Sequence, residues 1–161
     1  NLMYEKGSPI ESLLLERGVH VLVNRAEEAD IHRTPLLIGG LTTSTEDYEE
    51  MALSFFKNTK IAVLLIADCP LPQSLLRVSA DGNIDLGICG HYHGGQFRFP
   101  VVGGLYHGDT GLFPKYNAGM YKLANGTIFV SRGMGGHNGL PRINNRPELA
   151  VIDINGRQET Q

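Results

Sequence analysis

The stretch IDLGICG, residues 84–90, runs directly into HYHGG, residues 91–95. Its first part is a short, mostly apolar run with the length and composition of a buried strand. Its second part holds two histidines, one residue apart, in front of two glycines. Because α/β proteins commonly bind ligands on loops that leave a sheet edge, this junction is the first place to look for a functional site.

Helix and strand signals alternate through the first ninety residues. The segment 8–18 begins with Ser8 as an N-cap followed by Pro9, and it ends at Gly18, which predicts a capped helix. This alternation predicts an α/β layered domain and argues against an all-β one. Further helices are expected at 46–57 and 71–80, and strands at 18–24, 35–41, 61–67 and 84–90.

The composition of the sequence changes after residues 84–95. Glycine, proline and aromatic residues crowd together as far as Tyr116, which predicts a long structured loop. The segment 120–133 is expected to form a hairpin with Asn125-Gly126 at its turn, and 149–154 a last strand. The second half is therefore expected to be antiparallel and β-rich, which gives an α+β layered fold. Since no linker or internal repeat is visible, residues 1–161 are expected to form a single domain.

The composition excludes several classes of protein. Hydrophobic residues make up 42% of the chain and charged residues 19%, so a folded core is expected. A formal net charge of −3 gives no strong signal for nucleic-acid binding. The longest apolar run, IAVLLIA at 61–67, is far shorter than the ~20 residues of a membrane-spanning helix, so no membrane segment is expected in this chain. The cellular location stays open between the cytoplasm and a membrane-associated state.

His91 and His93 are the first candidate site residues. In extended backbone, residues i and i+2 point to the same side about 6–7 Å apart. Two imidazoles in that arrangement can share one metal ion or serve two adjacent ions. Gly94 and Gly95 are expected to adopt positive φ and to allow close backbone approach. The alternative is that both histidines are exposed and idle.

The longer stretch GHYHGGQFRFP, residues 90–100, resembles the C-terminal signature of calcineurin-like metallophosphoesterases, which read Gly-His-x-His at this point. Gly90, Gly94 and Gly95 match the glycines of one branch, the small bacterial phosphohydrolases. The resemblance covers most of the chain. Three downstream stretches resemble the same branch: GLFPKYNAGMY (111–121), VSRGMGG (130–136) and PRINNRPEL (141–149).

The resemblance implies a fold and an activity. The fold is a four-layer α-β-β-α sandwich, of which this chain would form the C-terminal half. The activity is hydrolysis of phosphomonoesters or phosphodiesters by a water that two divalent metal ions activate. His91 would be a ligand of one ion and His93 of the other. Imidazole and carboxylate donors together suit manganese, iron or zinc.

The chain departs from the family pattern in its other metal-binding motifs. No Gly-Asn-His occurs in it, its one Asp-x-His is Asp30-Ile31-His32, and Gly108-Asp109, its one Gly-Asp pair, follows the histidines instead of preceding them. The resemblance therefore implies that the chain is the C-terminal part of a longer enzyme. Such a part is expected to have little activity alone and to bind its metals incompletely or not at all. It is also expected to expose apolar sheet surface and to self-associate.

Asp68 stands where the family usually has a ligand histidine. It follows the strand predicted at 61–67, in the sequence Ala67-Asp68-Cys69-Pro70. An aspartate can bind the same ions, but it can equally serve as the N-cap of the helix after Pro70. A competing interpretation is therefore a degenerate, non-catalytic homologue that binds a phosphate-containing ligand or a partner.

Several basic residues are candidates for contact with a phosphate. Guanidinium groups match phosphate oxygens well, which makes Arg98, Arg132 and Arg142 candidates, but each can instead be a structural ion-pair partner. His107 lies in the glycine-rich loop and is a weaker candidate for lining the site.

Overall fold

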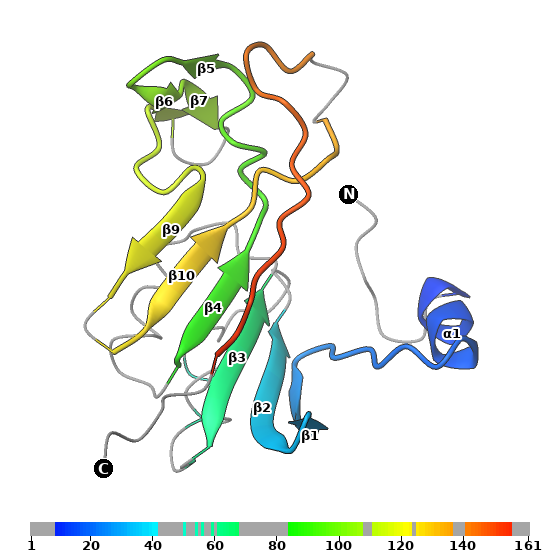
Figure 1. The fold of residues 1–161 in the computed structure, drawn as a ribbon. Helices are drawn as coiled ribbons and strands as arrows, with labels where there is room; N and C mark the ends of the chain where they lie inside the picture. Colours follow the sequence, from blue (N-terminus) through cyan, green and yellow to red (C-terminus); the bar gives the residue numbers. More distant parts are fainter. Residues whose placement is uncertain are drawn as a thin grey trace.

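A six-stranded mixed sheet forms the centre of the computed structural model, with strand order β1-β2-β3-β4-β10-β9 (Figure 1). Together with the helix α1 it gives the mixed α/β character predicted from the sequence. The structure describes residues 9–41, 50, 54, 56, 59, 61–67, 84–107, 111–123, 125–136 and 141–155. The strands of the sheet are β1 (Arg25–Ile31), β2 (Thr34–Leu41), β3 (Ala62–Ala67), β4 (Leu86–Cys89), β9 (Gly119–Lys122) and β10 (Thr127–Val130).

The four central strands are parallel, and the two edge strands are antiparallel to their neighbours. The register aligns the carboxyl ends of the parallel strands. Leu41 pairs with Ala67, Ala67 with Cys89, and Cys89 with Val130. Loops that leave β2, β3, β4 and β10 therefore start from one row of residues at one edge of the sheet, which is the edge where α/β proteins place ligands.

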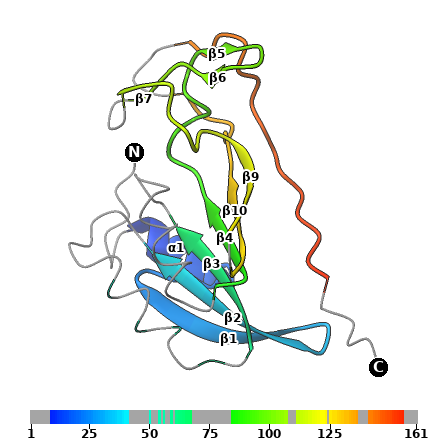
Figure 2. The same ribbon diagram turned by 90° about the vertical axis from the view of Figure 1, so that its left-hand side faces the viewer.

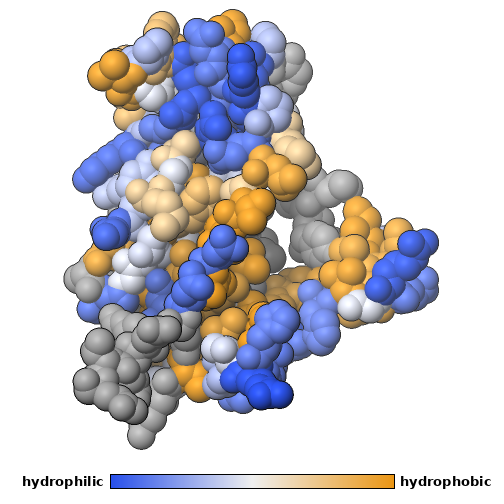
Figure 3. Space-filling model, viewed as in Figure 1, coloured by the Kyte–Doolittle hydropathy of each residue, from blue (hydrophilic) through white to orange (hydrophobic). Residues whose placement is uncertain are grey.

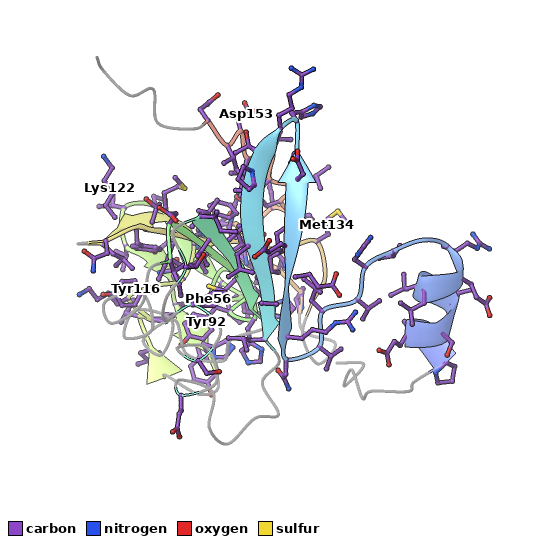
Figure 4. All side chains as sticks on the ribbon, turned by 90° about the horizontal axis from the view of Figure 1, so that it is seen from below. Phe56, Tyr92, Tyr116, Lys122, Met134 and Asp153 are labelled. Atoms are coloured by element: carbon purple, nitrogen blue, oxygen red, sulfur yellow. The ribbon has the colours of Figure 1, made fainter. Side chains whose placement is uncertain are left out.

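The core lies on one face of this sheet. Side chains alternate between faces along a strand, so Ile128 and Val130 of β10 point to the same side, and both are buried. Phe56 is fully buried on this face, while Asp153 lies on the opposite side of the sheet (Figure 4). The buried cluster consists of Leu41, Phe56, Val63, Ile84, Cys89, Ile128 and Val130.

Helix α1 (Pro9–Glu16) confirms the first predicted helix. Gly18, just beyond its last residue, is the predicted stop. It has φ 73° and donates its N–H to the carbonyl of Leu15 at 3.0 Å. The helix stands beside the β1 edge and does not cover the sheet (Figures 1 and 4), and it has no buried residue. No helix among the residues that the structure describes is long and apolar enough to cross a membrane.

Of the other two predicted helices, the structure describes only part of one. Glu50, Ser54 and Phe56 are helical, in agreement with the helix predicted at 46–57. The helix predicted at 71–80 lies outside the described residues.

Two strand predictions are wrong. The segment 19–24 is irregular, and the first strand is β1, which forms a hairpin with β2. At the other end of the chain, the predicted strand at 149–154 is not one, because residues 149–155 pair with none of the described strands. This segment runs along the sheet on the face opposite the core (Figure 2), with Leu149 and Val151 more than four-fifths exposed.

The predicted hairpin at 120–133 is confirmed as the antiparallel pair β9–β10. The predicted structured loop after β4 folds into two small sheets, one of β5 (Arg98–Phe99) with β6 (Gly103–Gly104) and one of β7 (Tyr106–His107) with β8 (Gly111–Leu112). No second large sheet facing the first is found in the described part of the chain. The sandwich implied by the family resemblance stays a prediction.

Candidate functional site

An open pocket of about 260 Å³ lies at the carboxyl edge of β3, β4 and β10. His91 and His93 both line it, and the loop that carries them leaves β4 as the sequence predicts. Arg132, just after β10, lines it as well. The complete lining is Ile66, Ile88, Cys89, Gly90, His91, His93, Ser131, Arg132, Gly133 and Gly135.

The backbone of the histidine loop is not extended, contrary to the sequence prediction. His91 has φ 72°, His93 φ 46° and Gln96 φ 51°, all in the left-handed region. The tight turn, rather than an extended i, i+2 repeat, places both histidines on the pocket. Non-glycine residues in this region each cost of the order of 1 kcal/mol or more, and such strain is concentrated at functional sites.

Gly94 and Gly95 adopt the positive φ expected for them, at 69° and 77°. Both also lie too close to their surroundings for a side chain. A Cβ on Gly95 would lie 2.6 Å from Gly104 Cα, and one on Gly94 would lie 2.8 Å from Arg132 Cγ. Gly90 is different, because a Cβ there would meet nothing within 4 Å.

Asn145, from a distant part of the chain, forms hydrogen bonds to the histidine loop. Its side chain is almost fully buried, and Nδ2 donates to the carbonyl of His93 at 2.6 Å and to that of Gln96 at 3.3 Å. Within the loop, the Gly95 N–H donates to the carbonyl of Tyr92 at 2.7 Å. These bonds support the left-handed turn and connect it to Asn145.

The ring of His93 has a defined orientation. Its Nδ1 lies 3.2 Å from the carbonyl oxygen of Gly135. In the tautomer that donates this hydrogen bond, Nε2 carries the lone pair, which is the atom that would bind a metal ion. Histidines that bind metals commonly use their other nitrogen in this way, so the contact fits a metal ligand.

The ring of His91 belongs to an aromatic group with Tyr92 and His107. The centroids of His91 and His107 are 5.3 Å apart, and those of Tyr92 and His107 4.3 Å. Tyr92 is almost completely buried. The structure thus brings His107 next to His91 although sixteen positions separate them in the sequence.

The three candidate arginines make structural contacts. Arg132 forms an ion pair with Glu148, with 2.8 Å between Nη2 and Oε1. Arg98 donates from Nη1 to the carbonyl of Gly94 at 2.8 Å and to Asn117 Oδ1 at 2.7 Å. Arg142 donates from Nε to the carbonyl of Gly135 at 2.7 Å. All three stabilise the loops around the pocket.

Burial and neighbouring charges shift the pKa values of Glu148 and Arg98. Burial raises the pKa of Glu148, but hydrogen bonds from the Arg132 backbone and guanidinium, together with the charges of Arg132 and Arg98, outweigh burial and lower it. The pKa of Arg98 is lowered, mainly by burial and then by the nearby Arg132 charge. The Glu148 carboxylate thus lies near the guanidinium groups of Arg132, Arg98 and Arg142 beside the pocket.

Asp68 lies outside the described residues. It follows Ala67 in the sequence, the last residue of β3, and Ala67 pairs with Cys89 at the pocket edge. Across the described ranges, no group of three or more His, Cys, Asp or Glu residues is placed to hold a metal ion. By donor chemistry the two histidines fit a transition metal, but they supply only part of its coordination sphere.

Sequence reasoning missed Asn145, Glu148 and Gly135. Each acts through a contact with a residue that is distant in the sequence, and periodicity carries no signal for such contacts. The stretch 141–149, which contains the first two, carries no sequence signal beyond its resemblance to the phosphohydrolase branch.

Comparisons with curated proteins support a metallophosphoesterase superfamily. One relative is the Escherichia coli (strain K12) protein "Phosphodiesterase YaeI", 35% identical over 91 residues, which cover 56% of this chain and 32% of that protein. Another is the Bacillus subtilis (strain 168) "Uncharacterized metallophosphoesterase YkuE", 30% identical over 114 residues, which cover 71% of this chain and 37% of that protein.

A third relative, the Bacillus subtilis (strain 168) "Uncharacterized protein YpbG", is 25% identical over 148 residues, which cover 90% of this chain and 52% of that protein. The chain thus spans between about a third and a half of the length of these curated relatives. No family model and no solved structure matches the chain.

Proposed function

We propose that the chain contributes to a metal-dependent phosphohydrolase that cleaves phosphomonoesters or phosphodiesters. The observation that carries the proposal is the placement of His91 and His93 on one pocket at the carboxyl edge of the sheet. The printed names of two relatives, a phosphodiesterase and a metallophosphoesterase, favour the same reaction class.

In this proposal each histidine has a defined task. His93 presents Nε2 to one divalent ion while Gly135 holds its Nδ1. His91 serves a second ion, with its ring positioned by Tyr92 and His107. Asp68 is the third proposed ligand. Two such ions would supply the Lewis acidity that lowers the pKa of a bound water molecule.

The basic residues have supporting tasks. Arg132 lines the pocket while Glu148 fixes its Nε and Nη2, so we propose that it acts on a phosphate through a positive charge held in place. Arg98 supports the turn through the Gly94 carbonyl, which makes it a positioning residue in this proposal. His107 positions the ring of His91.

Metal titration of the 161-residue chain tests the histidine assignment. Because the chain holds only part of the coordination sphere, we expect at most weak Mn²⁺ or Zn²⁺ binding by calorimetry, and we expect His91→Ala and His93→Ala each to weaken it at least tenfold. His20→Ala is the matched control, because this histidine is 82% exposed and its partner is Glu27. Equal loss in all three variants would contradict the assignment.

Hydrolysis of bis-p-nitrophenyl phosphate with added Mn²⁺ tests the reaction class. Since the chain holds no Gly-Asn-His and no Gly-Asp pair ahead of its histidines, and its one Asp-x-His (residues 30–32) lies at the β1–β2 hairpin, we expect little turnover by the 161 residues alone. Turnover comparable to that of an intact relative would contradict this. The full coding sequence gives a further test, because an Asp-x-His, a Gly-Asp and a Gly-Asn-His motif ahead of these residues would favour an enzyme.

A non-catalytic binding protein is the second candidate function. Asp68 in place of the expected histidine favours it. In that case Asp68→His would leave hydrolysis absent, and inorganic phosphate would bind with no turnover of the ester. A gain of metal affinity and activity in Asp68→His would favour the enzyme instead.

A further inference from the structure

The carbonyl that orients His93 belongs to a glycine-rich loop, residues 133–136, with the sequence GMGG. Met134, the one large side chain of this loop, is 68% exposed, and nothing lies within 4 Å of where a Cβ on Gly135 would be. Because glycine is conformationally permissive, neither side-chain packing nor backbone preference holds the Gly135 carbonyl in place. Its position must come from contacts with another part of the chain.

Arg142 supplies these contacts. Its Nε donates to the Gly135 carbonyl at 2.7 Å, and its Nη2 donates to the Arg132 carbonyl at 2.6 Å and also to the Gly135 carbonyl. The planar guanidinium group holds its donors in a fixed fork, so one side chain joins the two ends of the segment 132–135. This segment follows β10, and both Arg132 and Gly135 line the pocket.

The surroundings of Arg142 are polar. Residues 141–148 lie at the upper end of the molecule in Figure 1, and hydrophilic residues form much of the surface visible there in Figure 3. Arg142 is half-buried, and hydrogen bonds from a charged donor are stronger than those between neutral groups. Because arginine stays protonated, these bonds persist over the whole physiological pH range.

The Gly135 carbonyl oxygen is also the partner of the His93 ring, whose Nδ1 lies 3.2 Å away. A carbonyl oxygen accepts hydrogen bonds and cannot donate, so the Nδ1 that faces it carries the proton, and the neutral ring has its lone pair on Nε2. Free histidine in water prefers the opposite tautomer, with the proton on Nε2. The protein therefore has to impose the tautomer that the contact requires.

We propose that Arg142 is a positioning residue for His93. By holding the Gly135 carbonyl in place, the Arg142 fork keeps the proton of the His93 ring on Nδ1 and the lone pair on Nε2. The inference rests on the proposed function, in which Nε2 of His93 binds an ion. The tautomer exists without any metal, however, so it can be measured separately from metal binding.

Nitrogen NMR of the metal-free chain tests the proposal. Above about pH 8 the imidazole rings are neutral, and two-bond ¹H–¹⁵N correlation spectra distinguish the Nδ1–H from the Nε2–H tautomer. The chain has six histidines, and His93→Gln assigns the His93 signals by their loss. We expect His93 to be in the Nδ1–H form in the unmodified chain and to shift to the Nε2–H form in Arg142→Ala. Arg146→Ala, at an exposed position of the same segment, is the matched control and should leave His93 unchanged.

Arg142→Lys is a second variant, which keeps the charge and much of the side-chain volume if Arg142→Ala does not fold. A single ammonium group lacks the fork that holds both carbonyls, so we expect a mixture of the two tautomers. Three results would overturn the proposal: the Nε2–H form in the unmodified chain, an unchanged His93 signal in Arg142→Lys, or an equal shift in Arg146→Ala. The expected shifts without metal binding by the chain would uphold this proposal and count against the metal assignment.

Discussion

The Arg132 backbone N–H and the Arg132 guanidinium both donate to the Glu148 carboxylate. The backbone N–H lies 3.0 Å from Oε2, and Nε and Nη2 lie 3.0 and 2.8 Å from Oε1. The Glu148 N–H in turn donates to the Gly133 carbonyl at 3.0 Å. One glutamate thus links the end of β10, which lines the pocket, to the C-terminal segment.

Glu148→Gln is expected to destabilise the protein by about 1–3 kcal/mol, because hydrogen bonds to charged groups contribute this much when they are partly buried. Urea denaturation measures it. Glu27→Gln is the control: the partners of Glu27, Arg25 and His20, are 52% and 82% exposed, so a change below about 0.5 kcal/mol is expected. Equal effects of the two substitutions would show that the pair with Arg132 contributes no more to the free energy of unfolding than an exposed ion pair.

The stability of the protein should also depend on pH through Glu148. Its pKa is lower in the folded than in the unfolded state, so the folded protein binds fewer protons at this site. The stabilisation is therefore complete above the ordinary glutamate pKa of about 4.3 and is lost as the pH falls through the folded-state pKa. As the pH falls through this range, the free energy of unfolding should decrease less steeply in Glu148→Gln than in the unmodified protein. An equally steep decrease in both would contradict a lowered pKa of Glu148 in the folded state.

Gly95→Ala is expected to cost about 2–4 kcal/mol, since a Cβ would lie 2.6 Å from the Gly104 backbone and φ is 77°. Gly135→Ala is the matched control, because a Cβ there meets nothing within 4 Å. Thermal unfolding of the two variants should separate them clearly. If Gly95→Ala unfolds at the same temperature as Gly135→Ala, the close approach does not constrain the loop.

Asn145→Ala should reduce the affinity of the chain for Mn²⁺ roughly tenfold, because the carbonyls of His93 and Gln96 lose the donor that orders their loop. Calorimetric titration measures the affinity. Ile143→Ala is a control on the same segment, with an exposed side chain and a backbone contact to Phe97 that alanine keeps. An unchanged affinity in Asn145→Ala would show that the loop keeps its order without this residue.

Self-association is expected through the exposed C-terminal segment. Leu149 and Val151, 81% and 86% exposed, are two positions apart, so in a near-extended chain they present a common apolar side. Light scattering should show a dimer or larger species whose mass falls in Leu149→Asp. A monomer at high concentration would argue against this surface as an interface.

The sequence predicted the buried strands well and two exposed segments badly. β3 and β4 are apolar runs flanked by breakers, which is a strong signal. β1 reads RAEEADI and has no such pattern, and its hairpin turns through His32 and Arg33, with φ 52° and 67°, where Asn-Gly is the usual signal. The segment 149–154 alternates like a strand, but a strand also needs a partner, which the alternation cannot report.

The candidate site was predictable in composition and not in geometry. Placement of His91 and His93 at a sheet edge followed from the buried strand before them. The left-handed turn did not, because His91, His93 and Gln96 adopt a conformation that residues of their type rarely take unless long-range contacts impose it. Asn145 supplies such contacts across about fifty positions, and no local pattern records them.

This dependence on Asn145 has a consequence for the order of events during synthesis. The sheet strands up to β10 emerge from the ribosome before residue 131, and they can pair as they appear. The histidine turn cannot be completed until the Asn145 amide reaches the carbonyl of His93. A nascent chain that ends before Asn145 has its strands and both imidazoles but lacks their final arrangement, so the proposed site matures only after the strands that carry it.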